Sequence, residues 1–195
     1  MAQWRGKNQN LLAVGMLPSA IHSPRRMVLN KLNRLCLITL AFCAAGAQAQ
    51  AQAQAVRSEK NMSLELANQI AAASVAACLA NGYNVTATVV DRAGSVRAVQ
   101  RADNAGPHTL AASLNKAYTS ASAKNNTLAM MEGAQKNPGA ANLVHISGFL
   151  LLGGGVPVKV GNEVIGAVGI GGAPGGQLDE QCAVAALDKV KELLK

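Results

Sequence analysis

Residues 153–172 read GGGVPVKVGNEVIGAVGIGG, and we take this stretch as the starting point for the fold. Two runs rich in β-branched residues, Val156–Val160 and Val164–Ile170, flank the pair Gly161 and Asn162. A glycine at the first position of a two-residue turn suits the positive φ that a tight hairpin requires. The stretch therefore predicts a β-hairpin.

Glycine also occurs inside the second run, at Gly166 and Gly169. A glycine in a strand interior weakens the sheet, and it often marks a place where another group approaches the backbone closely. We expect that group to be a helix, a ligand or a neighbouring subunit.

The rest of the body divides into helices and strands. Ser63 and Gly82 bracket Leu64–Asn81 as helix caps, and Asp91–Gly94 has the composition of a type I turn. That turn joins two expected strands, Tyr83–Asp91 and Ser95–Ala102. The next helix opens after Pro107. Its expected buried face is made of Leu110, Leu114, Ala117 and Ala121.

Three more elements complete the chain. We expect a short helix over Thr127–Lys136, an apolar strand over Leu143–Leu152 and a closing helix over Leu178–Leu194. The buried face of the closing helix is expected to hold Cys182, Ala186, Val190 and Leu193. Hairpins make the sheet antiparallel, and strands that are apolar on both sides call for helices on both faces. The fold class is therefore α+β, a three-layer α/β/α sandwich around a central antiparallel sheet of about five strands.

The motifs that are missing also carry information. There is no βαβ run to turn the glycines into a dinucleotide fingerprint, and no Gly-Lys-Ser/Thr follows them to make a phosphate loop. The formal charge is +8, but six of the 18 basic residues lie before residue 35 and all ten acids lie after residue 56, so the body carries 12 − 10 = +2. Without a basic cluster or an aromatic platform there, nucleic acid is not an expected partner.

The first part of the chain is typical of a targeting leader. Residues 27–55 combine a basic start, an apolar run over Leu35–Ala45 and an Ala-Gln repeat with several cleavage sites, as in a secretory signal peptide. The apolar run is too short to span a membrane. Residues 1–26 are then a non-native upstream extension, and 56–195 form a single domain in the periplasm or outside the cell. A lipoprotein anchored at Cys43 is the alternative, although Phe42 is bulky for such a signal.

Two cysteines, Cys78 and Cys182, remain in the body. In the expected helices Cys182 faces the core, whereas Cys78 lies about a third of a turn from the stripe that contains Leu66. A disulfide requires converging side chains. We therefore expect these cysteines to be unpaired or only weakly paired.

A series of motifs in the body resembles the GlcG/HbpS-like heme-binding family. These motifs are Val89-Val90-Asp91-x-x-Gly94, Arg101-x-Asp103-x-Ala105-x-Pro107, Lys116-Ala117-Tyr118-Thr119, Gly153-Gly154-Gly155-Val156-Pro157, Gly161-x-x-x-Ile165-Gly166-Ala167-x-Gly169 and Asp179-Glu180. The resemblance covers roughly residues 63–195. It implies a profilin-like sandwich, a homo-oligomer and heme binding, with heme degradation in some relatives. Related domains accompany cobalamin adenosyltransferases and occur in glycolate-utilisation operons, so enzymatic activity stays open.

His108 is the candidate ligand for heme iron, because it begins a helix away from the expected core face. The alternative is an exposed capping histidine. Arg101 and Lys116 are candidates for the heme propionates, against a solvated rim or a salt bridge to Asp103 or Asp179.

Three further positions are candidates for ligand contact. Tyr118 could stack on a ligand or pack under the sheet edge, and Gly154 and Gly155 could admit a flat ligand or simply form a turn that leads into the hairpin. For His145 we expect a strand-end side chain bonded to the backbone.

Two functional classes remain. The first is an exported heme-binding or tetrapyrrole-binding protein that sequesters or degrades heme, with cobalamin as the less favoured ligand. The second is a non-catalytic oligomeric accessory protein of a glycolate or cobalamin-type utilisation pathway, in which the glycine-bearing hairpin or the helix surface beside it makes the subunit contacts. The family resemblance favours the first class, and the few aromatic residues favour the second, because ligand pockets commonly use aromatic walls.

Overall fold

The structure, a computed structural model, describes residues 55–195. The expected upstream extension and nearly all of the expected signal peptide lie outside the described residues. The chain from Ser58 to Lys195 forms one compact unit. Within the described part, no helix is long and apolar enough to cross a membrane.

The centre of this unit is one antiparallel sheet. Its strands are β1 (Thr86–Asp91), β2 (Val96–Arg101), β3 (Gly155–Val160) and β4 (Glu163–Gly171), arranged in the order β2-β1-β4-β3. Both expected hairpins are confirmed, and Gly161 opens the second turn with φ 60°. The described sheet has four strands, close to the expected number of about five.

The strand expected over Leu143–Leu152 is absent, because this segment packs on helices instead of a strand edge. A 3₁₀ helix, η1 (Pro138–His145), occupies its first part, and His145 lies exposed at the end of that helix. The Leu150 amide then donates to the Thr119 hydroxyl at 2.8 Å, and Phe149 meets the ring of Tyr118 edge-on.

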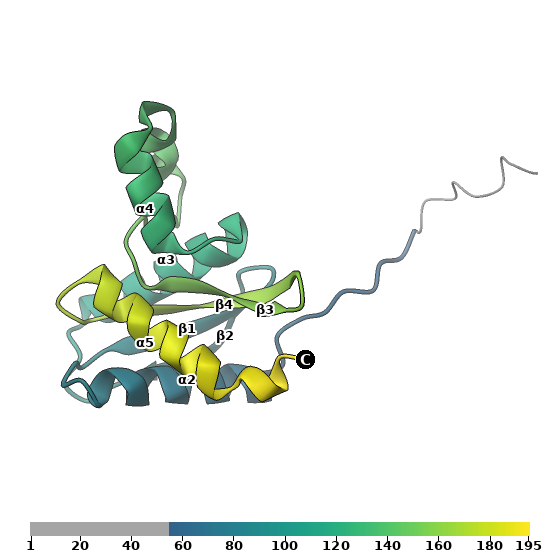
Figure 1. Ribbon diagram of the computed structural model, residues 1–195, viewed down its shortest axis with the longest axis horizontal. Helices are drawn as coiled ribbons and strands as arrows, with labels where there is room; N and C mark the ends of the chain where they lie inside the picture. The colour runs from purple at the N-terminus through teal and green to yellow at the C-terminus, as the bar shows by residue number, and fades with distance from the viewer. Residues whose placement is uncertain (1–54) are drawn as a thin grey trace, which may run out of the picture. The chain divides into compact units, whose positions relative to one another are not determined.

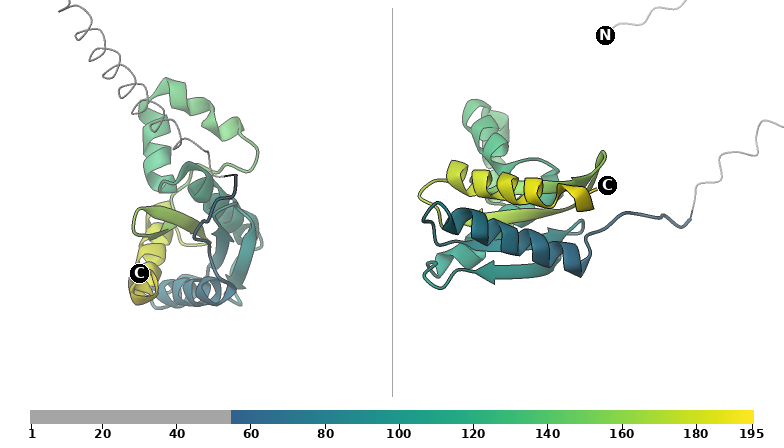
Figure 2. Two further views of the ribbon diagram at one scale, coloured as in Figure 1. Left: turned by 90° about the vertical axis from the view of Figure 1, so that its right-hand side faces the viewer. Right: turned by 60° about the horizontal axis from the view of Figure 1, so that its bottom comes forward.

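One face of the sheet is covered by α2 (Leu64–Leu79) and α5 (Gly176–Lys189), which run side by side (Figure 2). Side chains from these helices and from all four strands form the main apolar cluster of the domain. The Ser63 hydroxyl caps α2 by accepting the Leu66 amide, as expected. The closing helix ends earlier than expected, and a 3₁₀ turn, η2 (Lys191–Leu193), follows it and leaves Leu193 exposed.

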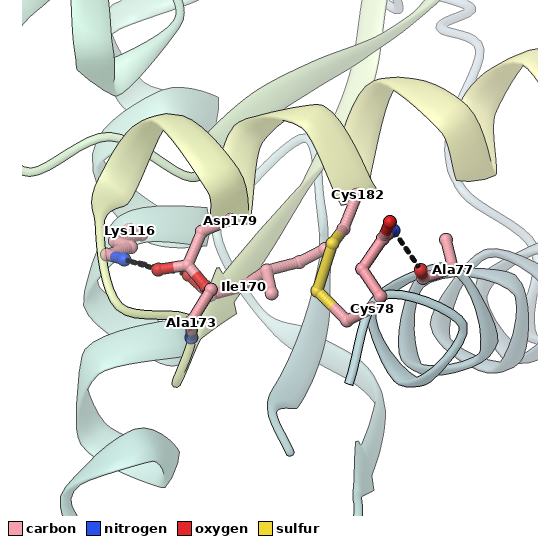
Figure 3. Close-up of a disulfide and its surroundings, with 8 residues drawn as sticks. Ala77, Cys78, Lys116, Ile170, Ala173, Asp179 and Cys182 are labelled. Carbon is pink, nitrogen blue, oxygen red and sulfur yellow. Dashed lines mark hydrogen bonds and ion pairs between the residues drawn. A yellow bond between two sulfur atoms is a disulfide. The ribbon is translucent and has the colours of Figure 1, made fainter. Parts of the chain in front are cut away.

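A disulfide joins the two helices of this face, so the expectation of unpaired cysteines is wrong (Figure 3). Cys78 and Cys182 have Cα atoms 5.4 Å apart and are separated by 104 residues in sequence. The expectation failed because it took Leu66 as the centre of the buried stripe of α2. Leu66 is only partly buried, whereas Ile70, Ser74 and Cys78, at helical spacing, are fully buried.

The opposite face is covered by α3 (His108–Ala123), so the three-layer sandwich is confirmed (Figure 1). The expected buried face of this helix is only half right. Ala117 and Ala121 are buried, but Leu110 and Leu114 are exposed. A different stripe turns toward the sheet, and it is mostly polar.

Hydroxyl pairs join α3 to β1. Thr109 and Ser113 bond to Thr86 and Thr88 at 2.7 Å in each case. All four of these side chains are buried. The Thr109 and Ser113 hydroxyls donate to the carbonyls of Gly106 and Leu110 and accept from the β1 hydroxyls, so every hydroxyl is satisfied without water.

Backbone atoms of the same chain lie close to Gly166 and Gly169, two glycines inside β4. A Cβ atom on Gly169 would lie 2.1 Å from the Ser113 carbonyl oxygen, and one on Gly166 would lie 2.2 Å from the Val90 carbonyl oxygen. Of the three explanations considered for these glycines, close approach of a helix accounts for Gly169. The space beside both glycines is therefore filled by backbone of the same chain.

The helix α4 (Thr127–Lys136) and η1 together project from the sandwich as an arm (Figure 1). Thr127 is the only buried residue of these two helices. Its hydroxyl donates to the Leu152 carbonyl and accepts the Gly155 amide, which anchors the arm to the start of β3.

Candidate functional site

A buried ion pair links the two helical layers through one end of the sheet (Figure 3). The Lys116 ammonium donates to Asp179 Oδ2 at 2.7 Å and to the Ile170 carbonyl at 2.8 Å. Asp179 Oδ1 accepts the Ala173 amide at 3.0 Å. Lys116 is 1% exposed and Asp179 is 2% exposed.

Burial raises the pKa of the Asp179 carboxyl, while the Lys116 charge and the backbone amides act in the opposite direction. The salt-bridge alternative for Lys116 is the one that the structure contains. Its ammonium is enclosed, so it cannot reach a propionate at the surface.

The candidate glycines are also enclosed. A Cβ atom on Gly154 would lie 2.7 Å from the Ile170 carbonyl oxygen, and one on Gly155 would lie 2.4 Å from the Lys116 carbonyl oxygen. Both glycines therefore allow the start of β3 to pass close to α3 and α5. They leave no room here for a flat ligand or an anion.

Tyr118 packs against other parts of the chain, as the second of its two interpretations proposed. Its ring meets Phe149 at a centroid distance of 6.3 Å and an interplanar angle of 74°. It also lies against Gly94 and Gly148, where an added Cβ would meet it within 3.2 Å. About a third of the residue remains exposed.

His108 and Arg101 are exposed and lie at the same short segment. His108 is the first residue of α3, and its ring lies so close to Gly106 that an added Cβ there would be 2.8 Å from His108 Cε1. Arg101, the last residue of β2, donates a hydrogen bond from Nη2 to the Ala105 carbonyl. A hydrogen bond thus fixes the guanidinium at Ala105, and the imidazole lies beside the next residue, Gly106.

The His108 imidazole has no hydrogen-bond or ion-pair partner among residues 55–195. The same part of the chain contains no group of three or more His, Cys, Asp or Glu side chains that could hold a metal ion. Both cysteines are consumed by the disulfide. The chemistry available at this segment is one free nitrogen ligand beside one fixed positive charge.

The residues that sequence reasoning missed are polar and buried. Asp179 was considered only as a possible partner for Lys116, and Thr127 was not singled out, although each organises several backbone groups. One signal was present, because Thr109, Ser113, Lys116 and Ser120 recur at helical spacing and are all buried. A polar stripe of this kind is normally assigned to solvent.

Residues 62–188 match the family model described as haem degrading protein HbpS-like. The chain belongs to this family. It is 35% identical to an uncharacterized 15.0 kDa protein of the dhaT-dhaS intergenic region of Citrobacter freundii. The alignment spans 136 residues, which are 68% of this chain and 94% of that protein. It is also 35% identical to protein GlcG of Escherichia coli K12 over 109 residues, which are 56% of this chain and 80% of GlcG.

Solved structures agree with this membership. A double mutant of Streptomyces reticuli HbpS superposes with a TM-score of 0.65 at 34% identity, covering 74% of this chain and 97% of that one. Klebsiella pneumoniae ORFY gives 0.67 at 31% identity, covering 71% and 96%. The PduOC–heme complex gives 0.59 at 22% identity, covering 66% and 94%, a likeness that shows the shared fold alone.

Proposed function

We propose that this domain binds heme or a closely related tetrapyrrole at the start of α3, with His108 as the iron ligand and Arg101 beside a propionate. The observation that carries the proposal is the pairing of an unpartnered imidazole with a guanidinium at residues 105 and 106. Membership of the HbpS-like family, which is described as haem degrading, supports it.

The two side chains suit these roles by their chemistry. The imidazole of histidine is a common axial ligand of heme iron. The Arg101 side chain uses one of its five N–H groups on the Ala105 carbonyl, and the remaining donors are free to bind a carboxylate. Heme would supply the iron and the carboxylates. Lys116, Gly154 and Gly155 have no part in this site.

The proposal includes export. The disulfide between Cys78 and Cys182 supports it, because such bonds persist in the periplasm and outside the cell and are rare in the cytosol. N-terminal sequencing of protein recovered from the periplasm would show cleavage at an Ala-Gln site. A cytoplasmic product that retains Met1 would contradict export.

Hemin titration of the purified protein tests the site. His108→Ala should abolish or shift the Soret band, because it removes the iron ligand. Arg101→Ala should leave the band in place but weaken affinity about ten- to hundredfold, as expected for a lost charge-assisted contact. His145→Ala is the matched control, since that histidine is also exposed but lies on the projecting arm.

If His108→Ala binds hemin as the wild type does, with an unchanged spectrum, the assigned ligand is wrong. If the wild type takes up hemin without saturation, the domain has no specific heme site.

A second candidate function, an oligomeric accessory protein, is favoured by the arm. Its apolar side chains Val144 and Ile146 are about half exposed, and η1 has no buried residue. Contiguous exposed apolar surface commonly marks a protein contact. The arm is therefore a better candidate for the assembly surface than the glycine hairpin. Light scattering that finds a monomer at micromolar concentration would rule out a stable homo-oligomer.

A further inference from the structure

A cavity of about 500 Å³ lies beside the tip of the β3–β4 hairpin, on residues that the heme proposal does not use. It is lined by Lys60, Arg92, Lys124, Val160, Gly161, Asn162, Glu163 and Val164. Three of these eight residues are basic and one is acidic. The three basic residues come from separate segments: the approach to α2, the β1–β2 turn and the end of α3.

The single acid of this lining is already engaged. Arg92 Nη1 donates to Glu163 at 2.7 Å and to the Lys60 carbonyl at 2.8 Å, and Arg92 Nε lies 3.2 Å from Glu59. The hydrogen bond from Arg92 lowers the pKa of Glu163, so its carboxylate stays charged and bonded to Arg92. These contacts hold the guanidinium in place at the cavity wall.

Lys124 is the unusual member of the group. It is the only residue other than glycine with positive φ in the described chain, at φ 56° and ψ 31°. This left-handed conformation at a helix end is usually taken by glycine, because a Cβ atom disfavours it. The Lys124 ammonium also forms no ion pair with any described residue. A strained residue with an unpartnered charge at a cavity wall is the pattern expected of a binding residue.

We infer that this cavity binds a small organic molecule through a carboxylate or phosphate group. Lys124 and Lys60 supply charge to that oxyanion, and Arg92, whose Nε and Nη1 are engaged by Glu59, Glu163 and the Lys60 carbonyl, adds its remaining Nη2 as a donor. Val160 and Val164 give the rest of the molecule an apolar wall. Glu59 and Glu163 balance two of the three positive charges of Lys60, Arg92 and Lys124, and a bound oxyanion would balance the third.

The test uses the purified protein without hemin, so it is independent of the heme proposal. Thermal unfolding is followed at low ionic strength with increasing inorganic phosphate or citrate, against sodium chloride of matched ionic strength. We expect at least one of the two oxyanions to raise the melting temperature saturably and beyond the chloride control. Phosphate acting alone indicates a phosphate ester as the natural ligand, and citrate acting alone indicates a carboxylate.

Lys124→Gly distinguishes a role in binding from a role in stability, because it should raise the melting temperature while weakening oxyanion binding. The variant should melt about 2–4 °C higher than the wild type without ligand, since glycine fits the left-handed conformation. It should also bind the oxyanion about tenfold or more weakly. Lys124→Arg should keep the binding, and Lys136→Ala, which removes an exposed charge outside the cavity, should leave it unchanged.

Two results would overturn the inference. One is a wild-type response to both oxyanions no larger than the chloride response. The other is a Lys124→Gly protein that binds as tightly as the wild type.

Discussion

The two faces of the sheet are held by different kinds of interaction. On the side of α2 and α5, apolar side chains fill the interface and a disulfide joins the helices. On the side of α3, hydroxyl pairs, a bare glycine backbone and an enclosed ion pair make the contact. The first face depends mainly on burying apolar area, whereas the second combines polar groups matched to partners with a small apolar cluster of Val90, Ala117, Ala121 and Ala167.

We therefore expect substitutions on the two faces to differ in their effect on stability. Apolar packing loses stability gradually as volume is removed. Removing one partner of a buried polar contact lowers the unfolding free energy in one large step, because the other partner is left without a hydrogen bond. The three predictions below test this contrast in order of expected size.

The largest effect is expected at the ion pair. Asp179→Ala leaves the Lys116 ammonium buried with only the Ile170 carbonyl, and it should cost about 3–5 kcal/mol of unfolding free energy. Urea denaturation measures this loss. The double variant Lys116→Met with Asp179→Ala should recover much of it, because no buried charge remains. A loss below about 1 kcal/mol for Asp179→Ala would show that the pair is not enclosed in solution.

Removal of the disulfide should come next. Replacing both Cys78 and Cys182 by Ala should lower the unfolding free energy by about 2–4 kcal/mol, mainly because the unfolded chain loses a long closed loop. Urea denaturation of the oxidised wild type, the reduced wild type and the double variant makes the comparison, and the last two should agree. Alkylation of the denatured, unreduced protein followed by peptide mapping should leave Cys78 and Cys182 unlabelled. Label on these two residues would contradict the bond.

The smallest of the three effects is expected at Gly169. Alanine there would press on the backbone of α3, which should cost about 1–3 kcal/mol. Gly133→Ala in α4 is the control, since nothing lies within 4 Å of a Cβ there, and it should be neutral or slightly stabilising. A Gly169→Ala protein as stable as the wild type would show that α3 does not lie so close.

The sequence patterns predicted the two hairpins and the order of the layers. Both hairpins, their turns and the three-layer order follow from β-branched runs, glycines and caps that act locally. The polar face could not be found in this way, because the leucines of α3 formed a convincing apolar stripe that the structure leaves exposed. Which helix face turns inward depended on Thr86 and Thr88, two residues on a distant strand.

The candidate site residues also differ in whether a local sequence motif could predict their positions. Arg101 ends β2 and His108 begins α3, at the two ends of one short loop, so a local motif could place both at this loop. Whether the Lys116 ammonium is buried or exposed depends on its ion pair with Asp179, 63 residues later in the chain, which no local motif reveals. The disulfide was missed for a related reason. The orientation of α2 was set by a stripe of Leu66, Ile70, Ala73 and Ala77, of which Leu66 and Ala77 are only partly buried.

The disulfide also turns most of the domain into a covalent ring. Cys78 and Cys182 enclose all four strands, α3 and the whole projecting arm. A protease that cuts the exposed arm once therefore opens the ring without releasing a fragment. The nicked protein would migrate as one species without reductant and as two with it, and domains linked in this way resist loss of their parts after a first cleavage.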